Sequence, residues 1–155
     1  MFDQPSTARP RPTDGSMEAA AAPTIWSPYW EIALGDCPTA LAWNPGADQL
    51  GAVSLAGEVV RIDVASGGSE RVADHPGGAL CVAWAGHRMI SGGQDGTVTV
   101  DGERVDVGGW VSAVASTVTS TVTSTGADAR CVAVAHGRQV SILDVGSSPR
   151  SPTAP

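Results

Sequence analysis

Short apolar runs separated by polar turn residues fill the chain from Trp30 to about Val145. Gly, Asp and Pro interrupt these runs at intervals of about ten residues, which is typical of strands joined by turns. No stretch has the apolar spacing of an amphipathic helix, and the 19 glycines of the chain would oppose helix formation. The pattern therefore predicts an all-β protein.

The apolar segments recur in the same order three times. The sequences CPTALAWNP and GALCVAWAG superpose with Trp43 on Trp84, a period of 41 residues, and WVSAVAST is a weaker third copy with Ala115 near the Trp position. Each copy is followed by a second and a third apolar segment. The third segments carry an Asp near their ends, at Asp63, Asp101 and Asp144. Three units of about 40 residues, each with three or four short strands, predict blades of a β-propeller.

The second unit resembles a repeat of the WD-repeat β-propeller family. His75, then PGGALCVAW, then MISGGQDGTVTV follow the family's order of a loop His, an apolar strand ending in an aromatic residue, a small-residue strand and an Asp-Gly turn. The resemblance implies a buried, structural hydrogen-bond network in which His75, Ser91 and Asp95 take the family's His, Ser or Thr, and Asp positions. The family's third-strand Trp is missing, because a second Asp-Gly turn falls there.

The first and third units are degenerate versions of the same repeat. They end in Ile62-Asp63 and Leu143-Asp144, so each keeps the Asp but replaces the family's Trp with an aliphatic residue, and neither has the loop His. The YVTN and pyrroloquinoline-quinone-type propellers share the blade without this His, and they stay open as alternatives.

The Asp95-Gly96 pair predicts a tight two-residue turn that requires a positive φ at Gly96. The inner strands are rich in Ala, Gly, Ser and Val, which suits blades that crowd toward an axis. Both features are physically consistent with the blade interpretation.

Three blades are fewer than the roughly four to eight of a closed propeller. The third unit lacks an outer strand, and residues 30–34 are expected to form an orphan outer strand of the kind that completes the last blade of a closed propeller. We therefore expect an incomplete propeller. It would be a truncated portion of a longer propeller, a fragment whose other blades lie on another chain, or a subunit that closes by self-association.

Composition divides the chain into three parts. Residues 1–23 form a Pro- and Ala-rich tail and residues 147–155 a Ser- and Pro-rich tail, both expected to be disordered, with the propeller segment at 24–146. The repeat STVTSTVTSTG, Ser116 to Gly126, falls between the first two strands of the third unit and predicts an expanded loop, whose role stays open.

The charge argues against a nucleic-acid partner, since the formal net charge is −7 and all nine basic residues are scattered arginines. No apolar run reaches the roughly 18 residues of a membrane span, and the N-terminus has no secretory signal, so a cytoplasmic location is expected. Cys37, Cys81 and Cys131 form no CxxC pair and predict buried small residues in strands rather than disulfides or a metal site.

A Ser-His-Asp triad is the sharpest catalytic interpretation of His75, Ser91 and Asp95. No nucleophile elbow or oxyanion loop accompanies them, so the structural network is the better explanation. His87 and His136 lie beside Gly and predict solvent-exposed turn positions. We expect no catalytic residue, no cofactor and no metal site.

The resemblance implies a non-catalytic protein-interaction scaffold with unknown protein partners. Two alternatives stay open, namely a propeller enzyme of the hydrolase or lyase type and a truncated product without independent function. The aromatic cluster Trp26, Tyr29 and Trp30 is a candidate partner-binding anchor, although packing against the first blade explains it as well.

Overall fold

The computed structural model describes residues 28–117 and 131–145, which form eleven strands in three antiparallel sheets and no helix. The first sheet, blade 1, contains β1 (Pro38–Trp43), β2 (Gln49–Ser54), β3 (Glu58–Asp63) and β4 (Ser69–Asp74) in that order. Blade 2 contains β5 (Ala79–Ala85), β6 (Arg88–Gly93), β7 (Thr97–Val100) and β8 (Glu103–Asp106). Blade 3 contains β9 (Val111–Ser116), β10 (Cys131–His136) and β11 (Gln139–Asp144). The all-β prediction is confirmed.

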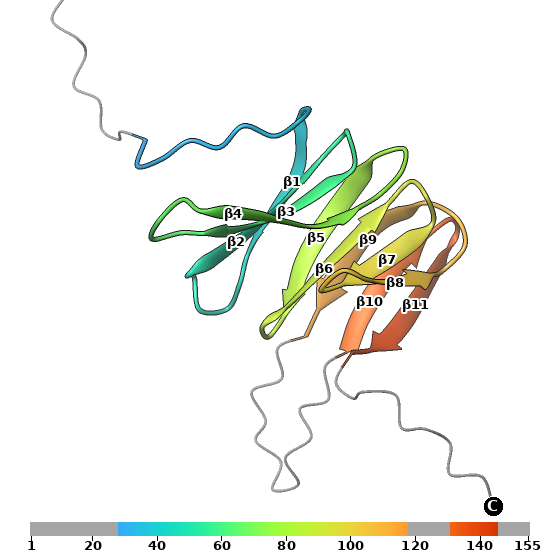
Figure 1. Cartoon of the computed structure of the whole chain (residues 1–155). Coiled ribbons are helices and arrows are strands. Elements are labelled where there is room, and N and C mark those ends of the chain that lie inside the picture. The colour runs from blue at the N-terminus through green and yellow to red at the C-terminus, as the bar shows by residue number, and fades with distance from the viewer. Residues whose placement is uncertain (1–27, 118–130, 146–155) are drawn as a thin grey trace, which may run out of the picture.

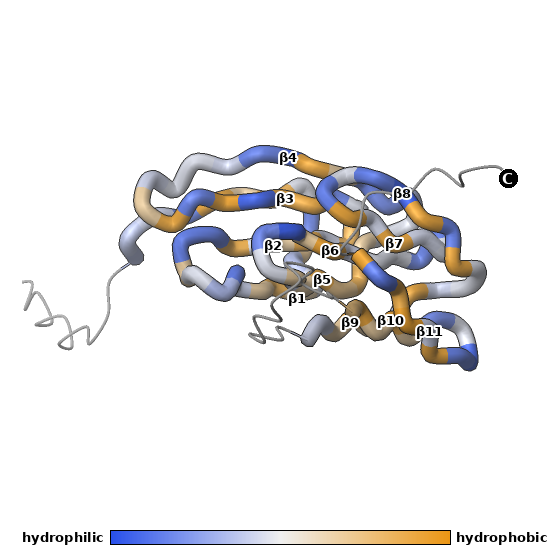
Figure 2. The backbone as a smooth tube through the Cα atoms, turned by 90° about the horizontal axis from the view of Figure 1, so that it is seen from below, coloured by the Kyte–Doolittle hydropathy of each residue, from blue (hydrophilic) through white to orange (hydrophobic). Residues whose placement is uncertain are grey.

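The three sheets lie side by side as consecutive blades (Figure 1). The first strand of each blade is the innermost, since β5 contacts both β1 and β9. Figure 2 shows these three strands close together, while β4 and β11 lie far apart at the outside. The described blades do not close into a ring, which confirms the expected incomplete propeller.

One β-bulge marks the second residue of every inner strand. Pairing slips at Thr39 in β1, at Leu80 in β5 and at Ser112 in β9. The first two bulges are 41 residues apart, the same period as the two Trp residues. Counting onward from the third bulge, Ser116 rather than Ala115 takes the Trp position. Ala115, which was predicted to lie near the Trp position, is the residue next to it.

The same backbone hydrogen bond recurs at one end of all three blades. There the first residue after the second strand donates to the residue before the inner strand: Leu55 N–H to Cys37 O, Gln94 N–H to Gly78 O and Gly137 N–H to Trp110 O, each at 2.9 Å. We call this end of the blades, formed by residues 55–57, 75–78, 94–96, 107–110 and 137–138, the turn rim. Because backbone hydrogen bonds join these loops, the turn rim is a rigid surface.

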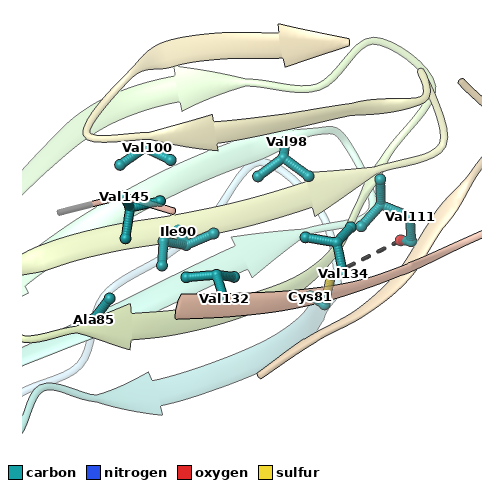
Figure 3. Packing of buried hydrophobic residues seen from close by; sticks show 9 residues of the cluster. All are labelled: Cys81, Ala85, Ile90, Val98, Val100, Val111, Val132, Val134 and Val145. Carbon is teal, nitrogen blue, oxygen red and sulfur yellow. Dashed lines mark hydrogen bonds between the residues drawn. The ribbon is translucent and has the colours of Figure 1, made fainter. Parts of the chain in front are cut away.

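Two apolar cores lie between the blades. The core between blades 1 and 2 is centred on Trp84 and Met89 of blade 2, with Val53 and Val59 of blade 1. The core between blades 2 and 3 is built from small side chains (Figure 3): Cys81, Ala85, Ile90, Val98, Val100, Val111, Val132, Val134 and Val145. This composition agrees with the crowding expected near an axis.

Gly92 shows why the inner strands need such small residues. A Cβ at Gly92 would lie 2.2 Å from Cγ1 of Val111 in the next blade. The two blades approach each other so closely here that no side chain fits between them.

Residues 30–34 are not a strand, contrary to expectation, because no strand among the described residues is placed to pair with them. They lie instead on the face of blade 1 that points away from blade 2, where Trp30, Ile32 and Leu34 pack against a buried cluster of Ala52, Val60 and Ile62.

The turn between β6 and β7 has three residues, Gln94 to Gly96, and not two as expected. Gly96 nevertheless has the positive φ that the sequence required, at 76°. The two-residue Asp-Gly turn is the next one, where Asp101 and Gly102 both have positive φ, at 49° and 89°.

Three sequence predictions fall largely or wholly outside the described residues. These are the disordered tails at 1–23 and 147–155 and the expanded loop of the Ser116 to Gly126 repeat.

Candidate functional site

The structure brings His75, Ser91 and Asp95 together between blades 1 and 2. His75 lies in the β4–β5 loop, Ser91 on β6 and Asp95 in the β6–β7 turn. The Nδ1 atom of His75 lies 2.9 Å from Oδ1 of Asp95, and its Nε2 atom lies 2.8 Å from Oγ of Ser91. The His75 and Ser91 side chains have no exposed surface.

Two threonines of β7 extend the network, and the sequence analysis missed both. The hydroxyl of Thr99 lies 2.6 Å from that of Ser91, and Thr97 donates its hydroxyl to Asp95 at 2.7 Å. Thr99 thus interacts with Ser91 from the third strand, β7, two residues before the Asp101-Gly102 turn. The alternation in TVTV was the available signal, because it places both threonines on one face of the strand.

The donors and acceptors of the network can be ordered from the carboxylate. An ionised carboxylate only accepts, so Nδ1–H of His75 donates to Asp95. In the neutral ring Nε2 then accepts from the Ser91 hydroxyl, which in turn accepts from Thr99. Every polar side chain in this chain of hydrogen bonds is therefore satisfied, which burial requires.

The pKa of the Asp95 carboxyl is set by two opposing effects. Burial raises it, but hydrogen bonds from Thr97 and His75 outweigh burial and hold the pKa below its usual value. Arg104 adds an ion pair to Asp95 at 3.1 Å and also donates to the carbonyl of Asp74 at 2.6 Å. The arrangement keeps Asp95 ionised and ties the outer strands of blades 1 and 2 together.

This geometry does not present a nucleophile to a substrate. A catalytic serine must contact the reacting carbonyl, whereas the Ser91 hydroxyl is fully buried and already pairs with Thr99 and His75. The three residues instead form a buried hydrogen-bond network between two blades.

His136 is buried, so the prediction of an exposed turn residue was wrong. Its Nδ1 atom lies 2.9 Å from the carbonyl oxygen of Gly108, and its Nε2 atom lies 2.8 Å from Oγ of Ser141. The physical reason is strand alternation, since His136 ends β10 on the same face as Val132 and Val134, which point at blade 2. His87 is exposed in its turn, as expected.

The aromatic candidates for partner binding separate in the structure. Tyr29 is 84% exposed, whereas Trp30 packs on blade 1 and donates its indole N–H to Val64 O at 2.8 Å. Trp26 lies outside the described residues. Trp110 and Leu55, which no sequence pattern singled out, are 63% and 47% exposed on the turn rim.

Among residues 28–117 and 131–145, no group of three or more His, Cys, Asp or Glu side chains could hold a metal ion. The same ranges contain no helix that is long and apolar enough to span a membrane. Cys37 is exposed, Cys131 partly buried and Cys81 buried, so the expectation of buried cysteines fails for Cys37.

No known family model matches the chain, and no curated protein matches it. Solved structures do. The β-propeller domain of Cps50 (Swd1) from Myceliophteria thermophila superposes with a TM-score of 0.58 at 18% identity, over 76% of this chain and 38% of that one. A chain of a mitotic checkpoint complex superposes with a TM-score of 0.53 at 20% identity, over 70% of this chain and 37% of that one.

These likenesses establish the fold: the described residues form three consecutive blades of a β-propeller. The resemblance inferred from His75, Ser91 and Asp95 is thus confirmed at the level of the fold. The chain spans less than two fifths of the length of either matched structure.

Proposed function

We propose that the chain is a non-catalytic protein-interaction scaffold whose binding surface is the turn rim. The observation that carries this proposal is the exposed Trp110, held in place by a hydrogen bond from Gly137 N–H to its carbonyl oxygen at 2.9 Å. A large aromatic side chain on a rigid loop loses little conformational freedom on binding, which is why Trp is enriched at interaction hot spots.

Leu55 gives the rim a second apolar contact point. It lies in the β2–β3 turn of blade 1 and is tied to the residue before β1 by its own N–H. Trp110 and Leu55 both lie on hydrogen-bonded loops of the same rim. This arrangement suits a protein partner whose surface has both apolar and polar groups. The cytoplasmic location stays a prediction from the sequence.

The experiment compares the full chain with a variant that carries both Trp110→Ala and Leu55→Ser. The immobilised wild-type chain should retain a specific protein partner, identified by mass spectrometry, and the double variant should lose it. Val105→Ser is the matched control, since Val105 is an exposed apolar residue on β8 and is not one of the residues that form the rim. Equal retention by all three chains would rule out the turn rim as the binding surface.

A further inference from the structure

Among the described residues, blade 3 has one strand fewer than its neighbours, and none of them covers its outward face. Within that part of the chain β11 is the edge strand of its sheet. The face that points away from blade 2 ends in Cys131 and Asp144, and its other strand residues are apolar: Ala113, Ala115, Ala133, Ala135, Val140 and Ile142. Val140 is 70% exposed and Ile142 65% exposed. An apolar face beside an edge strand is a surface that favours association with another strand or sheet.

The opposite end of the molecule carries the complementary feature. Residues 30–34 lie along the outward face of blade 1, with alternate side chains, Trp30, Ile32 and Leu34, packed against it, yet they belong to no sheet. Their backbone is therefore available for strand pairing, and their alternate side chains already pack against blade 1.

The position of residues 30–34 in the chain is that of an outer strand. The outer strand β4 precedes the inner strand β5 by a loop of four residues, 75–78, and β8 precedes β9 by the four residues 107–110. Residues 30–34 precede β1 by three residues, 35–37. The packing of residues 30–34 is also that of an outer strand. Val72 and Ala73 of the outer strand β4 lie against the core shared with the following blade, and residues 30–34 lie against blade 1 in the same way.

We propose that two copies of this chain assemble head to tail, with residues 30–34 of each copy adding antiparallel to β11 of the other as its fourth strand. The antiparallel direction follows from β4 and β8, which pair antiparallel to β3 and β7. Addition of a strand to an exposed sheet edge is an established mode of recognition. Each copy then supplies what the other lacks.

The three blades of the described residues are compatible with a dimer. Two copies of three blades give about six blades, within the roughly four to eight of closed propellers, whereas three copies would give about nine. Closure by two copies also leaves no open edge, which removes the aggregation hazard of exposed strands.

A groove on blade 1 is shaped to receive the other copy. It has a volume of about 180 Å³ and lies between residues 30–34 and the inner strands, with Ile32, Leu34, Leu41, Leu50 and Ile62 among its lining. Leu41 and Trp43 of β1 are exposed beside it. The apolar side chains of blade 3, Val140 and Ile142, match this lining in chemistry and would fill the groove.

Light scattering coupled to size-exclusion chromatography, or native mass spectrometry, tests the proposal on the full chain. The wild-type chain should be a dimer and Val140→Lys a monomer, because a lysine on this face would bury a charge against an apolar groove. Val105→Lys is the matched control and should remain dimeric, since Val105 is an exposed strand valine outside the proposed interface. Circular dichroism should be the same for all three chains.

A synthetic peptide of residues 28–36 gives a second readout that needs no substitution. Added in excess to the wild-type dimer, it should pair with β11 and convert the dimer to monomer, and a peptide of the same composition in scrambled order should not. A wild-type monomer overturns the proposal and leaves the two end faces to blades on another polypeptide. A dimer that both Val140→Lys and the peptide leave intact also overturns it.

Discussion

Asp95 illustrates how single residues hold the blades of this protein together. Its carboxylate accepts from His75 and Thr97 and pairs with Arg104, so one charge connects the β4–β5 loop, β7 and β8. The hydrogen bonds lower its pKa in the folded state in spite of partial burial. The folded protein therefore prefers the ionised form more strongly than the unfolded chain does, and the stability of the blade pair depends on that charge.

Acid should weaken the protein through this carboxylate. Since the folded-state pKa of Asp95 lies below the unfolded value of 3.8, its contribution is fully present above that value and is lost as the pH falls through the folded-state pKa. Urea unfolding measured from pH 6 downward should show a falling free energy of unfolding, and Asp95→Asn should be less stable at pH 6 but flatter with pH. Parallel curves for the two proteins would contradict this role of Asp95.

The cysteines should differ sharply in reactivity. Burial raises the pKa of the Cys81 thiol to about 11, and its Sγ lies 3.7 Å from the carbonyl oxygen of Gly92 inside the core, whereas Cys37 is exposed. Because the thiolate is the reactive form, iodoacetamide at pH 8 should alkylate Cys37 rapidly and Cys81 only after denaturation. Peptide mapping of the alkylated chain measures both. Rapid labelling of Cys81 in the folded chain would place it outside the core.

At the scale of elements, the turn between β6 and β7 tolerates little change. Gly96 closes the β6–β7 turn with a φ of 76°, and a Cβ there would lie 3.1 Å from the backbone nitrogen of Gly109 in the next loop. The turn that positions Asp95 is thus constrained both by its own backbone and by the neighbouring loop of the rim.

Gly96→Val should therefore destabilise the protein by about 1–3 kcal/mol, because a β-branched residue strongly disfavours positive φ. The free energy of unfolding in urea measures this cost. Gly68→Val is the control, since Gly68 is exposed, has no positive φ and approaches only the flexible Ser66 side chain. A loss no larger for Gly96→Val than for Gly68→Val would mean that the turn relaxes without strain.

At the scale of the whole molecule, stability depends on contacts between blades. Trp84 is buried between blades 1 and 2 and donates its indole N–H to Ala42 O at 2.8 Å across the interface. Arg61 of blade 1 lies over the same ring, with its guanidinium carbon 5.7 Å from the centroid, and pairs with Asp101 of blade 2 at 2.8 Å. The Trp84 side chain of blade 2 therefore makes an apolar contact, a hydrogen bond and a cation–π contact with blade 1.

Trp84→Ala should destabilise the chain by about 3–5 kcal/mol, the usual cost of deleting a large buried aromatic side chain. Trp110→Ala should change stability by less than about 0.5 kcal/mol, because Trp110 is largely exposed. Thermal or urea unfolding of the two variants compares them directly. Equal losses would show that the blades do not depend on the core around Trp84.

The sequence by itself determined the all-β class and the three units, because alternation and repetition are visible along the chain, whereas the His75–Ser91–Asp95 grouping was implied by the family resemblance. Strand alternation and the Gly and Asp residues at turns are local features, and the 41-residue spacing of Trp43 and Trp84 reveals the repeat. The alternation in TVTV could have placed Thr97 and Thr99 in the network. The burial of His136 could have been predicted because it lies an even number of residues from Val132 and Val134, on the same face of the strand.

Only the tertiary structure decided which of these residues meet across blades. The contact of Trp84 with Ala42 O, the approach of Gly92 to Val111 and the packing of Trp30 on blade 1 join residues between 19 and 42 positions apart. Residues 30–34 have the local pattern of a strand, but a strand requires a partner, and pairing is a property of the assembled sheets. The local pattern specifies what each segment can form, and the neighbouring blades determine what it does form.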